Sequence, residues 1–87
     1  MYVMFKVYVL YSRIHDKLYI GFTASLSNRL LSHNKLGNKD WTGRYRPWLL
    51  IYIEEYKTKK EAMEREKELK GGQGREFLRK EILSIFI

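Results

Sequence analysis

The chain has 87 residues, no cysteine, and 17 basic against 10 acidic side chains, which give it a net charge of +7. Because independent domains run from about 50 to 250 residues, we expect residues 1–87 to form a single domain, and the lack of cysteine excludes disulfides, thiolate metal sites and cysteine catalysis. No apolar run approaches the roughly 20 residues of a membrane-spanning helix and no signal-peptide pattern is visible, so we expect a cytoplasmic protein without a membrane partner.

The first part of the chain predicts a β-hairpin. Residues 5–12 are aromatic, aliphatic or β-branched, apart from Lys6, which is typical of a strand that is buried on much of both faces. A short polar turn over 13–17 and a second apolar run over 18–22 predict an antiparallel partner strand. Gly21 weakens this second strand unless another group approaches its backbone closely.

A helix and an exposed cationic loop follow the hairpin. The helix is predicted by apolar residues at helical spacing, namely Leu26, Leu30 and Leu36. Thr23 or Ser25 is suited to cap its start and Gly37 to stop it. Residues 38–46 lack periodicity and combine cations with aromatic rings, and function often lies on such loops.

The second part of the chain predicts a third strand and two helices. Residues 48–56 resume the strand pattern. Thr58 and Glu61 form a capping box, in which each side chain satisfies a helix-start amide of the other, and predict a helix to about Lys70. Three glycines are expected to end this helix and to keep the following residues non-helical, namely Gly71, Gly72 and Gly74. A last helix over 75–85 is expected to turn Phe77, Leu78, Ile82 and Ile85 inward.

The positive charge is concentrated in the first part of the chain. Residues 1–50 hold eight basic and two acidic side chains, a net charge of +6, whereas residues 51–87 hold nine and eight, a net charge of +1. A concentrated positive field attracts polyanions, and neutralised phosphates release counterions, so nucleic acid is the leading partner class. The alternative is an ordinary solvated basic surface next to helices with many surface ion pairs.

Two of the predicted helices have charged residues where apolar ones are expected. In the first helix, Arg29 and His33 lie one turn apart on the core-facing stripe, unless both lie at its edge and reach water. In the second, Glu66 shares the inward arc of Ala62 and Leu69. A buried carboxylate needs a partner. That partner is either Arg29 in a structural ion pair or a hard divalent cation, and Mg²⁺ suits one carboxylate completed by waters and phosphate oxygens.

Tyrosines of the first two predicted strands complete this group. Tyr8 shares a strand face with Leu10, and Tyr19 shares one with Gly21, so the two tyrosines converge if the strands form a hairpin. The alternative is that each tyrosine simply packs in the sheet with its hydroxyl at the rim.

In this order the residues resemble the GIY-YIG nuclease superfamily, in particular its small stand-alone bacterial members. The sequence Tyr19-Ile20-Gly21 matches the second family triplet letter for letter. The sequence Lys6-Val7-Tyr8 takes the place of the first triplet, with lysine for glycine and valine for isoleucine. Arg29, His33 and Glu66 follow in the family order, so the resemblance extends over most of the chain.

The resemblance implies a fold, a chemistry and a partner. The fold is an α/β (α+β) domain with a three-stranded antiparallel sheet flanked by helices, in the order β-β-α-β-α-α. The chemistry is metal-dependent phosphodiester hydrolysis by a DNA endonuclease of the repair or recombination type, with a single Mg²⁺ or Mn²⁺. Because family nucleases gain target choice from appended domains, we expect weak sequence specificity, a structure-selective substrate such as a branch, nick or flap, or a protein partner that supplies specificity.

The resemblance also implies roles for individual residues. Glu66 is the expected metal ligand and Arg29 the clamp on the scissile phosphate. Tyr8 is expected to take the proton from the attacking water, assisted by hydrogen bonds from Tyr19 and His33. Because the pKa of free tyrosine is about 10, the pKa of Tyr8 is expected to be shifted by neighbouring cations, Lys17 among them, or its proton to be relayed. The residues expected to bind nucleic acid are Lys17, Lys35, Lys39, Trp41, Arg44, Tyr45 and Arg46.

Two other functions stay open at this point. One is a nucleic-acid-binding module of the same fold with little or no catalytic activity, and the other is a structural adaptor without affinity for nucleic acid.

Overall fold

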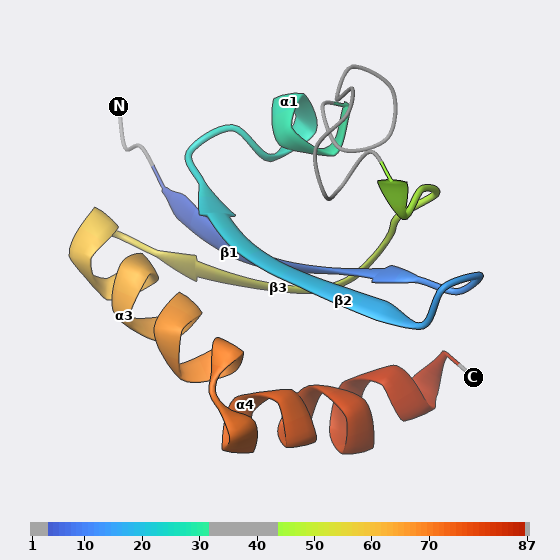
Figure 1. Ribbon diagram of the computed structural model, residues 1–87. Coiled ribbons are helices and arrows are strands. Elements are labelled where there is room, and N and C mark those ends of the chain that lie inside the picture. Colours follow the sequence, from blue (N-terminus) through green and yellow to red (C-terminus); the bar gives the residue numbers. More distant parts are fainter. Residues whose placement is uncertain (1–3, 32–43, 87) are drawn as a thin grey trace.

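The computed structural model describes residues 4–31 and 44–86, and its centre is a three-stranded antiparallel sheet (Figure 1). The strands stand in the order β2-β1-β3, and their bounds are β1 Phe5–Ser12, β2 Lys17–Thr23 and β3 Leu49–Tyr56. The helices are α1 Leu26–Leu31, α3 Lys59–Lys70 and α4 Gly72–Phe77. Helix α1 lies over one face of the sheet, and α3 and α4 lie over the other. The sheet and the element order confirm the predicted fold class.

The side chains of β1 divide the core into two layers, because successive residues of a strand point to opposite faces. Val7, Val9 and Tyr11 pack with buried residues of α3 and of the segment after α4. Tyr8 and Leu10 pack on the other face with Trp48 and with half-buried leucines of α1. From Val7 to Leu10 no side chain is more than 1% exposed, so β1 is buried on both faces, as predicted.

The pairing of β1 with β3 shifts register once. Val9 pairs with Tyr52 but Leu10 pairs with Leu50, which leaves Ile51 as an extra residue in β3. An extra residue puts two chain neighbours on the same face of a sheet. Ile51 and Tyr52 accordingly both contact the layer under α3 and α4.

The first hairpin is tied to the last helical segment through Asp16. The turn between β1 and β2 includes Asp16 at a positive φ of 52°. The Tyr11 hydroxyl donates to Asp16 Oδ1 at 2.9 Å, and Arg79 Nη1 donates to the same oxygen at 3.0 Å. This contact joins residues 63 positions apart, and the donors hold the pKa of the Asp16 carboxyl below its usual value.

Helix α3 begins at the predicted cap. Thr58 Oγ1 accepts from the Glu61 backbone N–H at 3.2 Å. The second bond of the predicted capping box differs, because the Glu61 carboxylate accepts from the Thr58 hydroxyl at 2.9 Å in place of the Thr58 amide. Among the described residues no helix has the length and apolar character needed to cross a bilayer.

The joint between α3 and α4 differs from the prediction. Gly71 ends α3, but α4 begins at Gly72 and contains Gly74. A Cβ on Gly74 would lie 2.2 Å from the Glu68 carbonyl oxygen and 2.4 Å from Leu69 Cα. The prediction that Gly72 and Gly74 interrupt the helical structure is therefore wrong. Because Gly74 has no side chain, the backbone of α4 can pack directly against the backbone of α3.

After α4 the helix widens into a π turn over Leu78–Ile82 and ends in a 3-10 turn over Leu83–Ile85. A π turn contains one more residue than an α turn, which rotates the side chains that follow. Leu83 is therefore buried, whereas Ile85 is 74% exposed, and the prediction that Ile85 faces inward is wrong. The other three residues predicted to face inward do contact the core, namely Phe77, Leu78 and Ile82.

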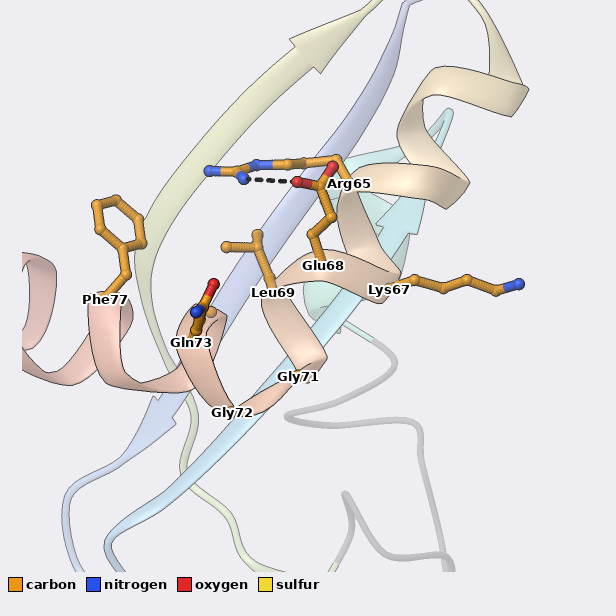
Figure 2. A pocket seen from close by; sticks show the side chains of 9 residues that line it. Arg65, Lys67, Glu68, Leu69, Gly71, Gly72, Gln73 and Phe77 are labelled. Carbon is orange, nitrogen blue, oxygen red and sulfur yellow. Dashed lines mark ion pairs between the residues drawn. The ribbon is translucent and has the colours of Figure 1, made fainter.

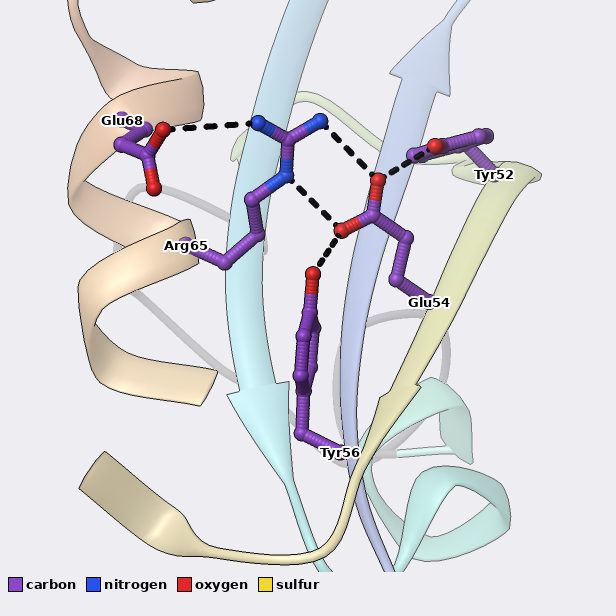
Figure 3. Close-up of polar contacts among 5 residues, drawn as sticks. All are labelled: Tyr52, Glu54, Tyr56, Arg65 and Glu68. Carbon is purple, nitrogen blue, oxygen red and sulfur yellow. Dashed lines mark hydrogen bonds and ion pairs between the residues drawn. The ribbon is translucent and has the colours of Figure 1, made fainter. Parts of the chain in front are cut away.

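A polar cluster docks α3 on β3 (Figure 3). Arg65 Nε and Nη2 donate to the two carboxylate oxygens of Glu54, at 2.8 and 3.0 Å. The hydroxyls of Tyr52 and Tyr56 donate to the same carboxylate. Burial of Glu54 opposes its ionisation, but these donors outweigh it and hold the pKa of the carboxyl below its usual value. Such a bidentate pair is directional and restricts rotation of α3 about its axis.

Gly74→Ala is expected to lower the free energy of unfolding by about 1–3 kcal/mol, because the added methyl group meets backbone atoms that no side-chain rotation can move away. Gly72→Ala is the matched control. Nothing lies within 4 Å of a Cβ at that position, so the better helix propensity of alanine should leave stability unchanged or raise it. Urea unfolding followed by circular dichroism measures both variants, and equal stabilities would contradict the close helix crossing.

The stability of the protein is expected to fall in acid partly because of Glu54. Since the folded pKa of Glu54 lies below the ordinary value of 4.5, its ionised form contributes stability that is present above that value and is lost as the pH falls through the folded pKa. Urea midpoints measured from about pH 7 to about pH 3 should therefore depend less on pH in Glu54→Gln than in the wild type. Glu55→Gln, at an exposed neighbour on the same strand, should keep the wild-type dependence. The same dependence in all three proteins would contradict the assignment.

Candidate functional site

The close approach of Tyr8 to Gly21 organises the candidate site. The two residues are paired across β1 and β2. A Cβ on Gly21 would lie 2.7 Å from the Tyr8 hydroxyl oxygen and 3.0 Å from Tyr19 Cε1. The missing side chain therefore lets the Tyr8 phenol lie over β2, which is an edge strand of the sheet. The close approach that Gly21 suggested in the sequence is present.

Tyr19 lies beside Tyr8 on the face of the sheet that α1 covers. Tyr19 is paired with Leu10, and its ring centroid is 6.1 Å from that of Tyr8 and 6.3 Å from that of Trp48. Tyr8 is 1% exposed, whereas Tyr19 is only partly buried. The two phenols thus converge, with Tyr8 inside and Tyr19 toward the rim.

Arg29 and Glu66 act on the ionisation of the Tyr8 hydroxyl from two different helices. Both are near enough to act on its ionisation, Arg29 by favouring the phenolate and Glu66 by opposing it. Arg29 lies in the last turn of α1 and is exposed. The side chain of Glu66, on α3, is 18% exposed. Four elements, β1, β2, α1 and α3, thus contribute Tyr8, Tyr19, Arg29 and Glu66, and the last three all act on the ionisation of Tyr8.

Arg29 lies at the rim of the site and not in the core. The sequence placed it on the core-facing stripe of its helix, but among the described residues of α1 none is buried. Leu26 and Leu30 fill the contact with the sheet instead. The prediction of an inward Arg29 is therefore wrong, and the edge position considered as the alternative describes it, because a guanidinium is stable only where it stays hydrated or paired.

The pKa of Tyr8 moves in the direction opposite to the one expected. Burial raises the pKa above the usual 10.0, Tyr19 raises it further, and the opposing effect of Arg29 is smaller. Lys17, which was expected to lower it, lies over the ring of Tyr45, with Nζ 5.6 Å from the ring centroid. In the folded chain the Tyr8 hydroxyl is therefore protonated at neutral pH.

Glu66 is paired with Lys70 and not with Arg29. Its Oε1 accepts from Lys70 Nζ at 3.0 Å, one helical turn away. The expected structural pair with Arg29 is absent from the ion pairs of the described residues. Successive helix residues point about 100° apart, so the Arg65–Glu54 contact on β3 leaves Glu66 on a different side of α3, and Glu66 acts on the ionisation of Tyr8.

The donor atoms at Glu66 suit a hard divalent cation. A carboxylate and two phenols present only oxygen atoms, the ligands that Mg²⁺ and Mn²⁺ prefer. Within 4–31 and 44–86 no three His, Cys, Asp or Glu side chains come together as a metal site. One carboxylate fits Mg²⁺, which usually binds through one or two carboxylates and completes its shell with waters and substrate phosphates.

The residues expected to bind nucleic acid are only partly described. Those outside the described residues are Lys35, Lys39 and Trp41, together with His33 of the predicted catalytic set. Arg44 is exposed, whereas Tyr45 and Arg46 are partly buried. The Tyr45 ring packs against the layer of Tyr8 and contacts His15, with ring centroids 5.3 Å apart, and Lys17. Tyr45 is therefore in part a packing residue.

A hollow of about 510 Å³ lies at the joint of α3 and α4 (Figure 2). The side chains that line this hollow include those of Arg65, Lys67, Glu68, Gln73 and Phe77. Neither the two tyrosines of the site nor Arg29 or Glu66 lines it. This hollow is therefore separate from the candidate site.

Comparison with known proteins finds a family and several bacterial relatives that this chain is similar to. The model of the GIY-YIG catalytic domain family matches residues 4–80. A UPF0213 protein of Staphylococcus haemolyticus is 38% identical over 68 residues, which cover 77% of this chain and 83% of that protein. For a UPF0213 protein of Staphylococcus epidermidis the identity is 37% over the same shares. One of Bacillus velezensis is 39% identical over 51 residues, 59% of this chain and 52% of that protein.

Gly21→Ala is expected to destabilise the protein by about 1–3 kcal/mol, because the new methyl group overlaps the Tyr8 ring. In a Tyr8→Ala background the overlap is gone, so the cost of Gly21→Ala should be smaller, and a double-mutant cycle of urea unfolding measures the difference. Tyr8→Phe is the control background, because ring atom Cζ, 2.8 Å from the same Cβ position, remains. An equal cost in all three backgrounds would show that the two residues do not contact each other.

Proposed function

Since the chain belongs to the GIY-YIG catalytic domain family, a family of nucleases, we propose that it is an endonuclease that hydrolyses phosphodiester bonds in DNA with a single Mg²⁺ or Mn²⁺. The observation that carries this proposal is the contact of two phenols at the edge strand β2, together with a guanidinium on α1 and a carboxylate on α3 that act on the ionisation of the inner phenol. The residues are Glu66, Arg29, Tyr8 and Tyr19.

Arg29 is proposed to bind the scissile phosphate. The transition state of phosphodiester hydrolysis accumulates negative charge on the phosphate oxygens, which a preorganised cation stabilises. A guanidinium matches a phosphate through two parallel hydrogen bonds. The exposed position of Arg29 on α1 suits a polymer, because a DNA backbone can reach it without entering a cavity.

Tyr8 is proposed to relay a proton. Its hydroxyl is protonated and hydrogen-bonds with Tyr19, so its oxygen accepts the proton of the attacking water while its own proton passes to Tyr19. Tyr19 is only partly buried and passes a proton on to solvent. This relay fulfils the function of a base without a free phenolate.

Glu66 is proposed to hold the metal through a carboxylate oxygen. The bound ion supplies positive charge that stabilises the phosphate oxygens in the transition state. Among the described residues one carboxylate, that of Glu66, acts on Tyr8, which supports a one-metal site because two-metal sites gather several acidic ligands.

Contacts with the rest of the DNA are proposed for Lys17, Arg44, Tyr45 and Arg46 and, outside the described residues, for Lys35, Lys39 and Trp41. His33, which also lies outside the described residues, is proposed to assist catalysis by a hydrogen bond to the phosphate or the water. The charge of +6 over residues 1–50 supports binding through phosphates, which is insensitive to sequence. We therefore propose a substrate selected by structure, such as a branch, nick or flap of the kind that arises in repair or recombination. A partner protein would supply any sequence choice, and the cytoplasm is the proposed place of action.

Glu66→Ala is expected to lower the cleavage rate at least about a hundredfold, the usual effect of removing one transition-state contact. Cleavage of duplex, single-stranded and branched DNA is measured with Mg²⁺ or Mn²⁺, and DNA binding is measured with Ca²⁺, where Glu66→Ala should bind like the wild type. Glu64→Ala is the matched control, because Glu64 is an exposed carboxylate on the same helix, and it should cut normally.

Other outcomes separate the remaining functions. Cutting by Glu66→Ala at the wild-type rate would reject the role of Glu66. A wild-type protein that binds the DNA panel but cuts none of it would be a binding module of the same fold, and Arg44→Ala should then weaken binding. A protein without affinity for DNA at low salt would be a structural adaptor.

A further inference from the structure

The carboxylate that is proposed to hold the metal already contacts a cation of the chain itself. Lys70 Nζ lies 3.0 Å from Glu66 Oε1. The two residues are four positions apart, with glutamate nearer the helix start, which is the favourable order for such a pair. The Glu66 side chain is 18% exposed and the Lys70 side chain 49%, so the lysine is the more exposed partner of the pair.

A second lysine–glutamate pair at the same spacing is more exposed to solvent than the pair of Lys70 and Glu66. Lys80 Nζ lies 2.6 Å from Glu76 Oε1, also four residues apart, but these side chains are 70% and 60% exposed. Water and salt screen such an exposed pair, whereas a partly buried pair is screened less. The glutamate that faces Tyr8 is therefore held more strongly by its lysine than an ordinary surface glutamate.

We propose that Lys70 is a built-in competitor of the divalent metal at Glu66. Its ammonium neutralises the carboxylate until a metal ion displaces it, and the contact thereby sets the metal concentration at which the site fills. This inference rests on the proposed function, because it takes Glu66 as the metal ligand.

The physical basis is charge repulsion at one carboxylate. An ammonium at 3.0 Å from Glu66 Oε1 and a divalent ion on the same oxygen repel each other strongly at that separation. The metal therefore binds only when Nζ leaves. Lysine has a flexible four-carbon stem, and about half of the Lys70 side chain is exposed, so its ammonium can move into water without any change in the backbone of α3.

The test measures Mn²⁺ binding by the whole chain without DNA, from the electron paramagnetic resonance signal of free Mn²⁺. Lys70→Met removes the ammonium and keeps the apolar stem, and it should lower the Kd for Mn²⁺ about two- to fivefold, the effect expected of one such ion pair. The difference should shrink at high salt. Lys70→Gln, which also removes the charge, should give the same result, and urea unfolding shows that each variant is folded.

Two control variants each remove the charge of a lysine other than Lys70. Lys80→Met breaks the matched pair with Glu76, and Lys67→Met removes an exposed cation one turn earlier on α3. Both should leave the Kd for Mn²⁺ near the wild-type value. If Lys67→Met tightens Mn²⁺ binding as much as Lys70→Met does, a general field effect explains the result and the inference is overturned.

The remaining outcomes distinguish this inference from the proposed function. Mn²⁺ binding that is lost in Glu66→Ala but unchanged in Lys70→Met and Lys70→Gln overturns the inference and leaves the metal site intact. Mn²⁺ binding that is the same in Glu66→Ala as in the wild type overturns both. Tighter binding in both Lys70 variants, together with its loss in Glu66→Ala, supports both.

Discussion

The contact between the Tyr8 phenol and the bare backbone of Gly21 is the constraint on which the site depends. Sheet pairing sets the two residues opposite each other, and only glycine leaves room for a hydroxyl oxygen 2.7 Å from the Cβ position. Because β2 is an edge strand, the phenol that crosses it comes within reach of groups on both sides of the sheet, Arg29 from α1 and Glu66 from α3. The two tyrosines and the glycine are thus one structural unit, and the charged groups are arranged around it.

Helix α3 uses neighbouring residues for two different purposes. Arg65 binds the Glu54 carboxylate on the sheet, and Glu66, about 100° further around the helix, acts on the ionisation of Tyr8. The rotation that suits the structural contact also sets the direction of the carboxylate proposed to hold the metal. If α3 docked on the sheet one residue out of register, the Glu66 carboxylate would point in another direction. Such a shift would therefore change the chemistry of the site and not only the stability of the fold.

Local patterns predicted most of the fold, but they did not predict the surroundings of the candidate site residues. Some features depend only on near neighbours in the chain and could therefore be recognised from the sequence. They are the strand alternation, the capping residue Thr58 and the Tyr-Ile-Gly triplet. The interruption at Gly74 was mispredicted. Of the alternatives left open for Arg29, the structure has the edge position and not the inward one, and the pKa of Tyr8 is raised and not lowered. Each of these outcomes depends on burial or on helix crossings. The spacing of Glu54, Tyr52 and Tyr56 on alternate strand positions was a signal for the polar cluster, but its partner Arg65 became visible only in three dimensions.

The position of β1 at the centre of the sheet has a consequence for synthesis on the ribosome. This strand precedes both of its neighbours in the chain, and β3, the later one, ends at Tyr56. Until that strand has emerged, β1 exposes one row of unpaired amides and carbonyls, together with side chains that become almost wholly buried between Val7 and Leu10. Such a nascent chain has an open, apolar strand edge of the kind to which chaperones and other unfolded chains bind.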